Sequence, residues 1–165
     1  MEFEEYVAAR GRALERYAFV LTGDRQRSQD LVQIALAKAY RHWRRVAKAE
    51  HPDAYVRRIL TTSYLDWRRR RSSTEEPVGD LPEQSADGGD PADQVVLRDE
   101  LLRALTVLTP QQRAVLVLRH YEAYDDAAIA AVLGCSEGTV RSHATRGAQR
   151  LRAILDPTNL QEGPR

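Results

Sequence analysis

Hydrophobic residues recur at intervals of three and four along most of the chain, which is the spacing of one face of an α-helix. In the N-terminal part this pattern predicts three helices, at about 2–21, 24–46 and 52–71. Gly23 is a typical helix stop, and Pro52 suits the first turn of a helix. We therefore expect a short loop, 47–52, between the second helix and the third.

The pattern breaks after residue 71, where Ser, Glu, Asp, Gly and Pro replace the periodic apolar residues. Residues 72–95 carry seven acidic side chains and no basic one, a net charge of −7. Such a segment cannot bury enough apolar surface to offset the entropy lost on ordering. The composition predicts a flexible acidic linker over 72–92.

Helical spacing resumes beyond the linker and predicts four more helices. The first ends near Leu108, Thr109-Pro110 caps the second, Asp125-Asp126 opens the third, and Ser136 caps the last. Strand-like alternation is absent, so the predicted fold class is all-α. We expect two small helical domains, 1–71 and 93–156, that move independently on their linker, followed by a polar tail over 157–165.

The segment from Asp126 to Arg146 has the pattern of a helix-turn-helix. Gly134 suits a turn that penalises a Cβ atom, Val140 can fill the angle between the two helices, and Ala130-Ala131 provide small side chains where the helices approach. An ordinary helical hairpin remains the alternative. For DNA binding, the exposed face of the last helix offers Glu137, Thr139, Arg141, Ser142, His143 and Arg146.

The N-terminal domain is basic, although the whole chain has a formal net charge of only +1. Residues 1–71 hold 16 Lys and Arg against 9 Asp and Glu, and the third helix ends in four consecutive arginines, 68–71. Arginines attract phosphates, and aromatic side chains stack on unpaired bases. This favours nucleic-acid binding, yet for Tyr55, Tyr64 and most of their aromatic and aliphatic neighbours packing in a core is the simpler interpretation.

Several classes of function are disfavoured. Cys135 is the only cysteine, no Cys/His cluster has the spacing of a zinc site, and the four histidines lie apart. We expect no metal, no cofactor and no enzymatic activity. No apolar stretch approaches the roughly 20 residues of a membrane span, and the acidic N-terminus is unlike a signal peptide. A cytoplasmic protein without membrane contact is expected.

Taken together, the motifs resemble the extracytoplasmic-function group of bacterial sigma factors, in particular an actinobacterial subgroup. Asp30-Leu-Val-Gln33 with the following Ala35–Tyr40 resembles the family's segment that docks on the clamp helices of the polymerase β′ subunit. Pro52–Leu60 and Asp66–Arg71 resemble the segment that melts and reads the minus-ten element. Leu105–Leu118, with the helix-turn-helix behind it, resembles the domain that reads the minus-thirty-five element. Ile34 departs from the acidic residue that family members usually carry there.

The resemblance implies a sigma factor that binds core RNA polymerase, at the β′ clamp helices and β flap, and promoter DNA in double-stranded and melted form. A regulatory anti-sigma factor is a further possible partner. The implied core contacts are Asp30, Leu31, Gln33, Ala37, Tyr40 and Arg41. The implied minus-ten contacts are Ala47, Lys48, His51, Pro52, Arg57, Arg58, Trp67, Arg68, Arg69, Arg70 and Arg71. The alternative is a helix-turn-helix regulator that acts without joining core polymerase.

Overall fold

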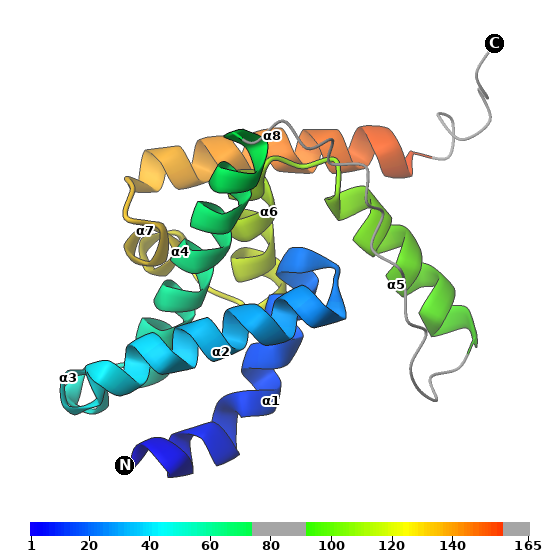
Figure 1. Cartoon of the computed structure of the whole chain (residues 1–165). Coiled ribbons are helices and arrows are strands. Elements are labelled where there is room, and N and C mark those ends of the chain that lie inside the picture. The colour runs from blue at the N-terminus through cyan, green and yellow to red at the C-terminus, as the bar shows by residue number, and fades with distance from the viewer. Residues whose placement is uncertain (74–91, 157–165) are drawn as a thin grey trace.

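The computed structural model describes residues 1–73 and 92–156, and within them every secondary-structure element is helical (Figure 1). The expected all-α class is confirmed. Most of the predicted linker and the predicted tail lie outside the described residues. In chain order the elements are α1 (Phe3–Thr22), α2 (Arg25–Arg41), α3 (Trp43–Lys48), α4 (Pro52–Ser73), α5 (Ala92–Leu105), α6 (Pro110–Leu116), the π-helix η1 (Val117–Tyr121), α7 (Asp126–Leu133) and α8 (Glu137–Leu155).

Local capping signals place most helix ends where the sequence predicts them. Gly23 and Gly134 both adopt the left-handed conformation, with φ of 68° and 67°, at the ends of α1 and α7. The Asp24 side chain accepts a hydrogen bond from the backbone N–H of Arg27 at 3.0 Å. Thr109 and Gln112 form a reciprocal capping box at the start of α6. These contacts satisfy backbone groups that a helix end leaves without partners.

The predicted helix over 24–46 is wrong in one respect, because the chain breaks at His42 between α2 and α3. The break allows Trp43 to pack against two aromatic rings of α1, with ring centroids 5.4 Å from Phe3 and 5.3 Å from Tyr6. The Trp43 Nε1 group also donates to the carbonyl oxygen of Met1 at 3.0 Å. Helix α3 then continues through Lys48, so the predicted loop at 47–52 shrinks to residues 49–51.

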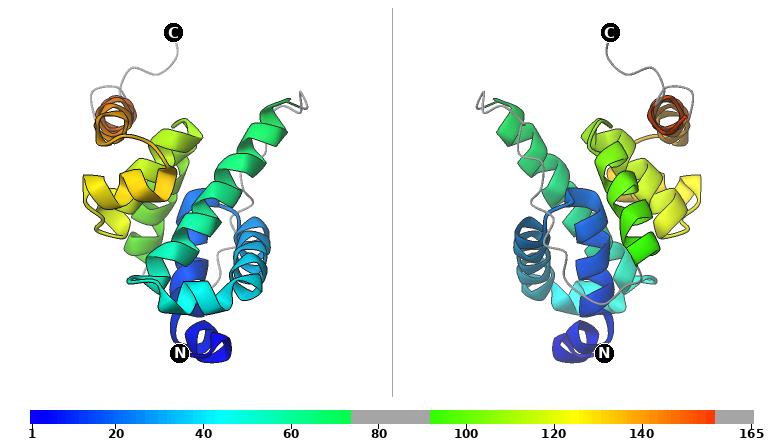
Figure 2. Two further views of the ribbon diagram at one scale, coloured as in Figure 1. Left: turned by 90° about the vertical axis from the view of Figure 1, so that its left-hand side faces the viewer. Right: turned by 90° about the vertical axis from the view of Figure 1, so that its right-hand side faces the viewer.

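The described residues fold into two main helical groups (Figure 2). Helices α1, α2 and α4 enclose large buried side chains, including Leu14, Tyr17 and Tyr64. Helices α6, α7 and α8 pack around Leu118 and Ile129. The predicted core role of most of the third-helix aromatics is confirmed, since Tyr64 is fully buried and Tyr55 packs against the core.

The two groups are packed on one another, and their expected independent movement stays a prediction. Helix α4 contacts α6 and α7, and α1 contacts η1. The buried apolar residues form one continuous cluster, and the ribbons of the two groups lie side by side in Figures 1 and 2. Arg113 of α6 reaches across and donates two hydrogen bonds to the carbonyl oxygen of Val20, at 2.7 and 3.1 Å. Side-chain periodicity describes each helix alone, so it did not predict this long-range contact.

Gly134→Ala is expected to lower the free energy of unfolding by about 1 kcal/mol, because an alanine Cβ disfavours the left-handed conformation at φ 67° although space is available. Gly138→Ala, four residues on and within α8, is the matched control. Its Cβ would meet only ordinary contacts, so a gain of about 0.5 kcal/mol is expected. Urea unfolding of both variants measures the difference, and equal effects would contradict the assignment of Gly134 to a strained turn.

Buried tyrosines predict a loss of stability at alkaline pH. Burial raises the pKa of Tyr6, Tyr17 and Tyr64 above 10, so the unfolded chain releases these protons first and the free energy of unfolding falls as the pH rises above about 10. Burial lowers the pKa of Arg113 to about 10. This shift alone would raise the free energy of unfolding as the pH rises above 10, but three tyrosines act against one arginine.

The Tyr17→Phe variant isolates one of these groups. Its stability is expected to fall less steeply between pH 10 and 12, by up to about 1.4 kcal/mol per pH unit for the single proton removed. Urea midpoints measured across that range give the slope. Tyr121→Phe, at a tyrosine that is 48% exposed, serves as the control. A slope for Tyr17→Phe equal to that of the unaltered protein would contradict the account.

Candidate nucleic-acid interface

The segment from α7 to α8 has the geometry of a helix-turn-helix. After Gly134 the chain turns, and the Ser136 hydroxyl caps α8 by accepting a hydrogen bond from the backbone N–H of Thr139 at 3.1 Å. Val140 is fully buried between the helices, as predicted. Ala130 packs against the core, whereas Ala131 is exposed, which corrects its predicted place at the helix crossing.

The outer face of α8 gathers the predicted minus-thirty-five residues. Thr139, Ser142 and Arg146 are exposed and lie three and four residues apart, so they share one face of the helix, and His143 between them is half-buried. Arg141 forms an exposed ion pair with Glu137 at 4.0 Å. An exposed pair of this kind contributes little to stability, so the Arg141 guanidinium is available to a phosphate.

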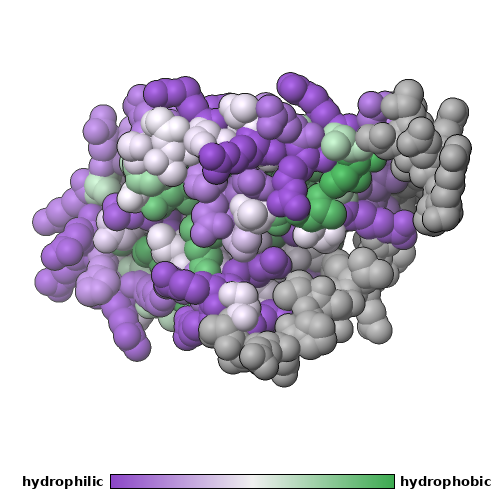
Figure 3. All heavy atoms as spheres, turned by 90° about the horizontal axis from the view of Figure 1, so that it is seen from above, coloured by the Kyte–Doolittle hydropathy of each residue, from purple (hydrophilic) through white to green (hydrophobic). Residues whose placement is uncertain are grey.

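The C-terminal end of α4 presents the predicted basic run. Arg69 and Arg70 are exposed, and Arg68 and Arg71 are half-buried. Polar and charged side chains cover most of the molecular face that is seen from above in Figure 3. Arg69 is paired with Asp66 on the helix surface. Arg69 and Arg70 are therefore accessible at the protein surface.

Trp67 has cationic neighbours over its ring. The guanidinium carbons of Arg27 and Arg71 lie 4.5 and 5.6 Å from the ring centroid, within cation–π distance. The indole is half-buried and packs against the core. A nucleic-acid base that stacks on Trp67 must therefore compete with a guanidinium group already in contact with the ring.

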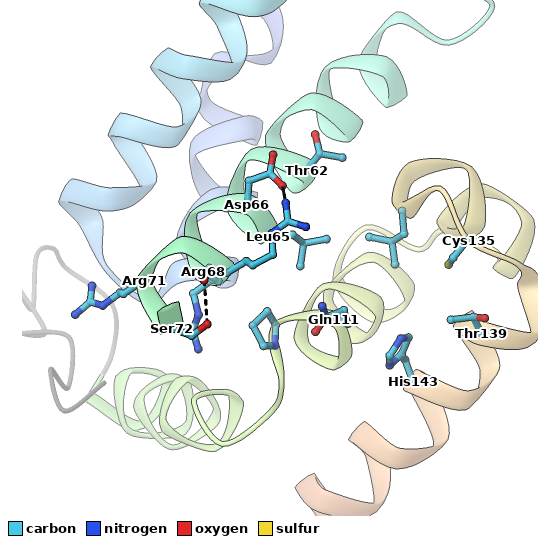
Figure 4. A pocket seen from close by; sticks show the side chains of 13 residues that line it. Thr62, Leu65, Asp66, Arg68, Arg71, Ser72, Gln111, Cys135, Thr139 and His143 are labelled. Carbon is cyan, nitrogen blue, oxygen red and sulfur yellow. Dashed lines mark hydrogen bonds and ion pairs between the residues drawn. The ribbon is translucent and has the colours of Figure 1, made fainter. Parts of the chain in front are cut away.

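A groove of about 550 Å³ separates the end of α4 from the helix-turn-helix (Figure 4). Arg68 and Arg71 lie on the α4 side, and Cys135, Thr139 and His143 lie on the other. Burial raises the pKa of the Cys135 thiol, which is consistent with an unreactive turn residue. The groove thus brings together side chains that the sequence assigned to two separate promoter elements.

Arg57 is a correction to the predicted DNA contacts. Its side chain is only 5% exposed and lies in the interior, where Nε donates to the Glu122 carboxylate at 2.8 Å and NH1 pairs with Asp53. The Asp53 carboxylate also accepts a hydrogen bond from the Tyr6 hydroxyl at 2.9 Å. Burial opposes the charged form of Arg57, but the two carboxylates outweigh it and raise its pKa. In this conformation Arg57 cannot reach a DNA backbone.

The other predicted minus-ten residues are divided between the two ends of α4. Ala47, Lys48, His51 and Pro52 lie near its start, and Arg58 is exposed nearly two turns inside it. The arginine run lies at the opposite end, roughly 27 Å away at 1.5 Å of rise per residue. The structure therefore does not gather these residues into one site.

An exposed stripe on α2 gathers most of the predicted polymerase contacts. Asp30, Gln33, Ala37, Tyr40 and Arg41 are exposed and recur at helical spacing. Within this stripe the apolar side chains of Ile34 and Tyr40 are 45% and 61% exposed.

Leu31 is a further correction, since it is 5% exposed and packs in the core. It lies on the buried face of α2 with Ala35, four residues on. This placement removes Leu31 from the surface that a protein partner could reach.

Sequence reasoning missed Glu122 and Arg113, which make the polar contacts between the two helical groups. Glu122 is 65 residues from Arg57, and no spacing rule connects them. Arg113 is 3% exposed although it stands in the polar run at the start of α6. Over the described ranges no group of three His, Cys, Asp or Glu could hold a metal ion, and no helix among them is long and apolar enough to cross a membrane.

Comparison with known proteins accounts for both helical groups. The family model for sigma-70 region 2 matches residues 6–74, and that for sigma-70 region 4 matches residues 98–151. The RNA polymerase sigma-E factor of Streptomyces avermitilis is 42% identical over 160 residues, covering 97% of this chain and 88% of that one. The ECF RNA polymerase sigma factor SigL of Mycobacterium tuberculosis is 31% identical over 157 residues, covering 93% and 86%.

A solved structure is similar over nearly the whole chain. It is the sigma factor RpoE from Bartonella quintana in complex with the anti-sigma factor NepR, with a TM-score of 0.75 at 25% sequence identity. The match covers 94% of this chain and 97% of that chain.

Proposed function

The chain belongs to the sigma-70 family, as an extracytoplasmic-function sigma factor that directs promoter-specific transcription, and we propose which of its surfaces bind core RNA polymerase and which bind promoter DNA. The observation that carries the proposal is the presence, in one chain, of matches to region 2 and region 4. A regulator that never joins polymerase would not need the first of these. Its relatives are sigma factors rather than enzymes.

The α2 stripe docks on core RNA polymerase, at the clamp helices of β′. Support comes from Ile34 and Tyr40, which leave apolar surface in contact with water on a helix whose other exposed residues are mostly polar. Asp30, Gln33 and Arg41 surround them with hydrogen-bonding groups. An apolar centre with a polar rim is the usual anatomy of a protein interface. The β flap is the second contact that family membership suggests, through the region 4 half.

Promoter DNA is read at two separate places. The exposed face of α8, from Glu137 to Arg146, enters the major groove of the minus-thirty-five element. The turn between α3 and α4 receives a minus-ten base that is flipped out of the stack, and the exposed Lys48, His51 and Arg58 surround that place. The arginine run at the far end of α4 holds the backbone of the same DNA through phosphate contacts.

An anti-sigma protein regulates the chain, and the chain acts in the cytoplasm. The support for regulation is that the structurally similar sigma factor from Bartonella quintana was solved in complex with an anti-sigma factor. The likeness extends over both helical groups, so a protein partner that contacts both at once would meet a similar arrangement here.

Run-off transcription on a promoter library tests the function directly. Bacterial core polymerase with the protein is expected to initiate at a shared two-part sequence, and core polymerase alone is not. Initiation that does not depend on the protein, together with no binding to core polymerase at low salt, would instead favour a helix-turn-helix regulator.

The double variant Ile34→Ala/Tyr40→Ala is expected to weaken binding to core polymerase at least about tenfold, since buried aromatic anchors dominate interface energies. Tyr121→Ala removes another exposed tyrosine, 48% exposed and outside α2, and is the matched control. Fluorescence titration of labelled protein with core polymerase gives both affinities. Equal affinities for the double variant and the unaltered protein would exclude the α2 stripe as the docking surface.

A further inference from the structure

The groove between α4 and the helix-turn-helix has a volume of about 550 Å³, which is within the range of sites that hold small organic ligands (Figure 4). Its walls come from the second half of α4, the start of α6, the end of α7 with the turn behind it, and the first half of α8. The major groove of duplex DNA alone is about 12 Å wide, more than the edge of a cube of this volume. The groove therefore has room for a small molecule and not for a duplex.

Most of the charged side chains along this groove are cationic. Arg68, Arg69 and Arg71 line it on the α4 side, and Asp66 is the one carboxylate among the lining residues. Asp66 is paired with Arg69. Arg68 is half-buried, and it forms no ion pair with any carboxylate of residues 1–73 and 92–156. The described part of the chain thus leaves an excess of positive charge at Arg68.

A second guanidinium group, that of Arg113 in α6, lies close enough to repel Arg68. Arg113 is 3% exposed, and its two hydrogen bonds go to the neutral carbonyl oxygen of Val20. Burial lowers the pKa of Arg113 to about 10, and the charge of Arg68 acts in the same direction. An anion bound at Arg68 would reduce this repulsion between like charges.

The groove also has apolar walls. Leu65 and Leu133 are half-buried and pack against the core from the two sides of the groove, and Pro110 lines it at the start of α6. Gln111 and His143 add hydrogen-bonding groups to the lining. Apolar walls with a few polar groups are typical of ligand sites, and a guanidinium group binds phosphate oxygens. This combination fits a flat organic ring that carries a phosphate group.

We propose that this groove binds a nucleotide, with its phosphates at Arg68 and its base against Leu65 and Leu133, and that the bound nucleotide competes with promoter DNA for α8. Hydrogen bonds between a guanidinium group and a phosphate are strengthened in a partly desolvated groove. Thr139 and His143 line the groove and also belong to the face of α8 that is proposed to enter the minus-thirty-five element. The competition rests on that proposed function, whereas nucleotide binding does not.

Calorimetric titration of the full chain tests the site, with ADP and GDP as probes because the apolar walls accept either base. Pyrophosphate and adenosine are the matched controls, since each carries only one part of the nucleotide. At least one nucleotide is expected to bind about tenfold or more tightly than either control, because the ring and the phosphates both contribute. Equal affinity for pyrophosphate would mean an adventitious ion only and overturns the proposal, as does the absence of binding by both nucleotides.

The variant Arg68→Ala is expected to weaken nucleotide binding about tenfold, since it removes charge-assisted hydrogen bonds to the phosphates. Arg68→Lys keeps the charge without the planar fork, so its affinity is expected to lie between those of Arg68→Ala and the unaltered protein. Arg12→Ala removes an exposed arginine of α1 and is the control for net charge.

Urea unfolding shows that Arg68→Ala is folded, and no loss of stability is expected from it because the repulsion with Arg113 is relieved. Full nucleotide affinity in folded Arg68→Ala overturns the proposal. An equal loss of affinity in Arg68→Ala and Arg12→Ala, which would reflect net charge alone, also overturns it.

Fluorescence anisotropy with a labelled mixed-sequence duplex tests the competition. Saturating nucleotide is expected to weaken duplex binding at least about fivefold relative to potassium chloride at the same ionic strength, which corrects for the general effect of salt. The same nucleotide concentration is expected to have little effect on Arg68→Ala. Unchanged duplex affinity at saturation overturns the proposal. Calorimetry does not depend on transcription, so failure of the nucleotide site and failure of the proposed function are distinguishable.

Discussion

The guanidinium of Arg57 places a permanent positive charge in the interior of the protein. In the folded state this buried charge needs an anionic partner. An arginine side chain does not give up its proton at ordinary pH, so only an anionic partner can compensate it. Asp53, one turn earlier in α4, supplies one carboxylate, and Glu122, 65 residues away, supplies the other. The contact with Glu122 connects the two helical groups. The apolar contacts of α4 with α6 and α7 lie at the same interface, beside the groove that Arg68 shares with His143.

Features that depend on neighbouring residues could be predicted from the sequence. Gly134, Ser136 and the Thr109–Gln112 capping box make contacts within one or two helical turns. Their residue types are typical of helix ends, so the sequence alone indicates their roles. The exposed face of α8 follows from the same periodicity. The break at His42 could not be predicted, because it depends on where Trp43 meets α1 across more than 35 residues. Leu31 was misplaced by motif resemblance, although helical spacing places it with the buried Ala35.

The candidate site was harder to predict than the fold, since its residues are assembled by tertiary packing. Resemblance grouped Pro52 and Arg70 as minus-ten contacts, and both assignments remain predictions. The structure adds that a rigid helix holds these positions at opposite ends. Helix α4 therefore acts as a spacer that presents one basic surface near α3 and another beside the helix-turn-helix. A promoter strand that contacts both would have to follow the length of this helix.

The π-helix over Val117–Tyr121 has a consequence for how related proteins can differ. It contains one residue more than a regular helical path would need, so deleting a single codon there would restore an ordinary α-helix and turn Glu122 about 100° away from Arg57. No residue on the outer face of α8 would change. A deletion or insertion of one residue at this place would thus remove or restore the ion pair between the two helical groups without altering the outer face of α8.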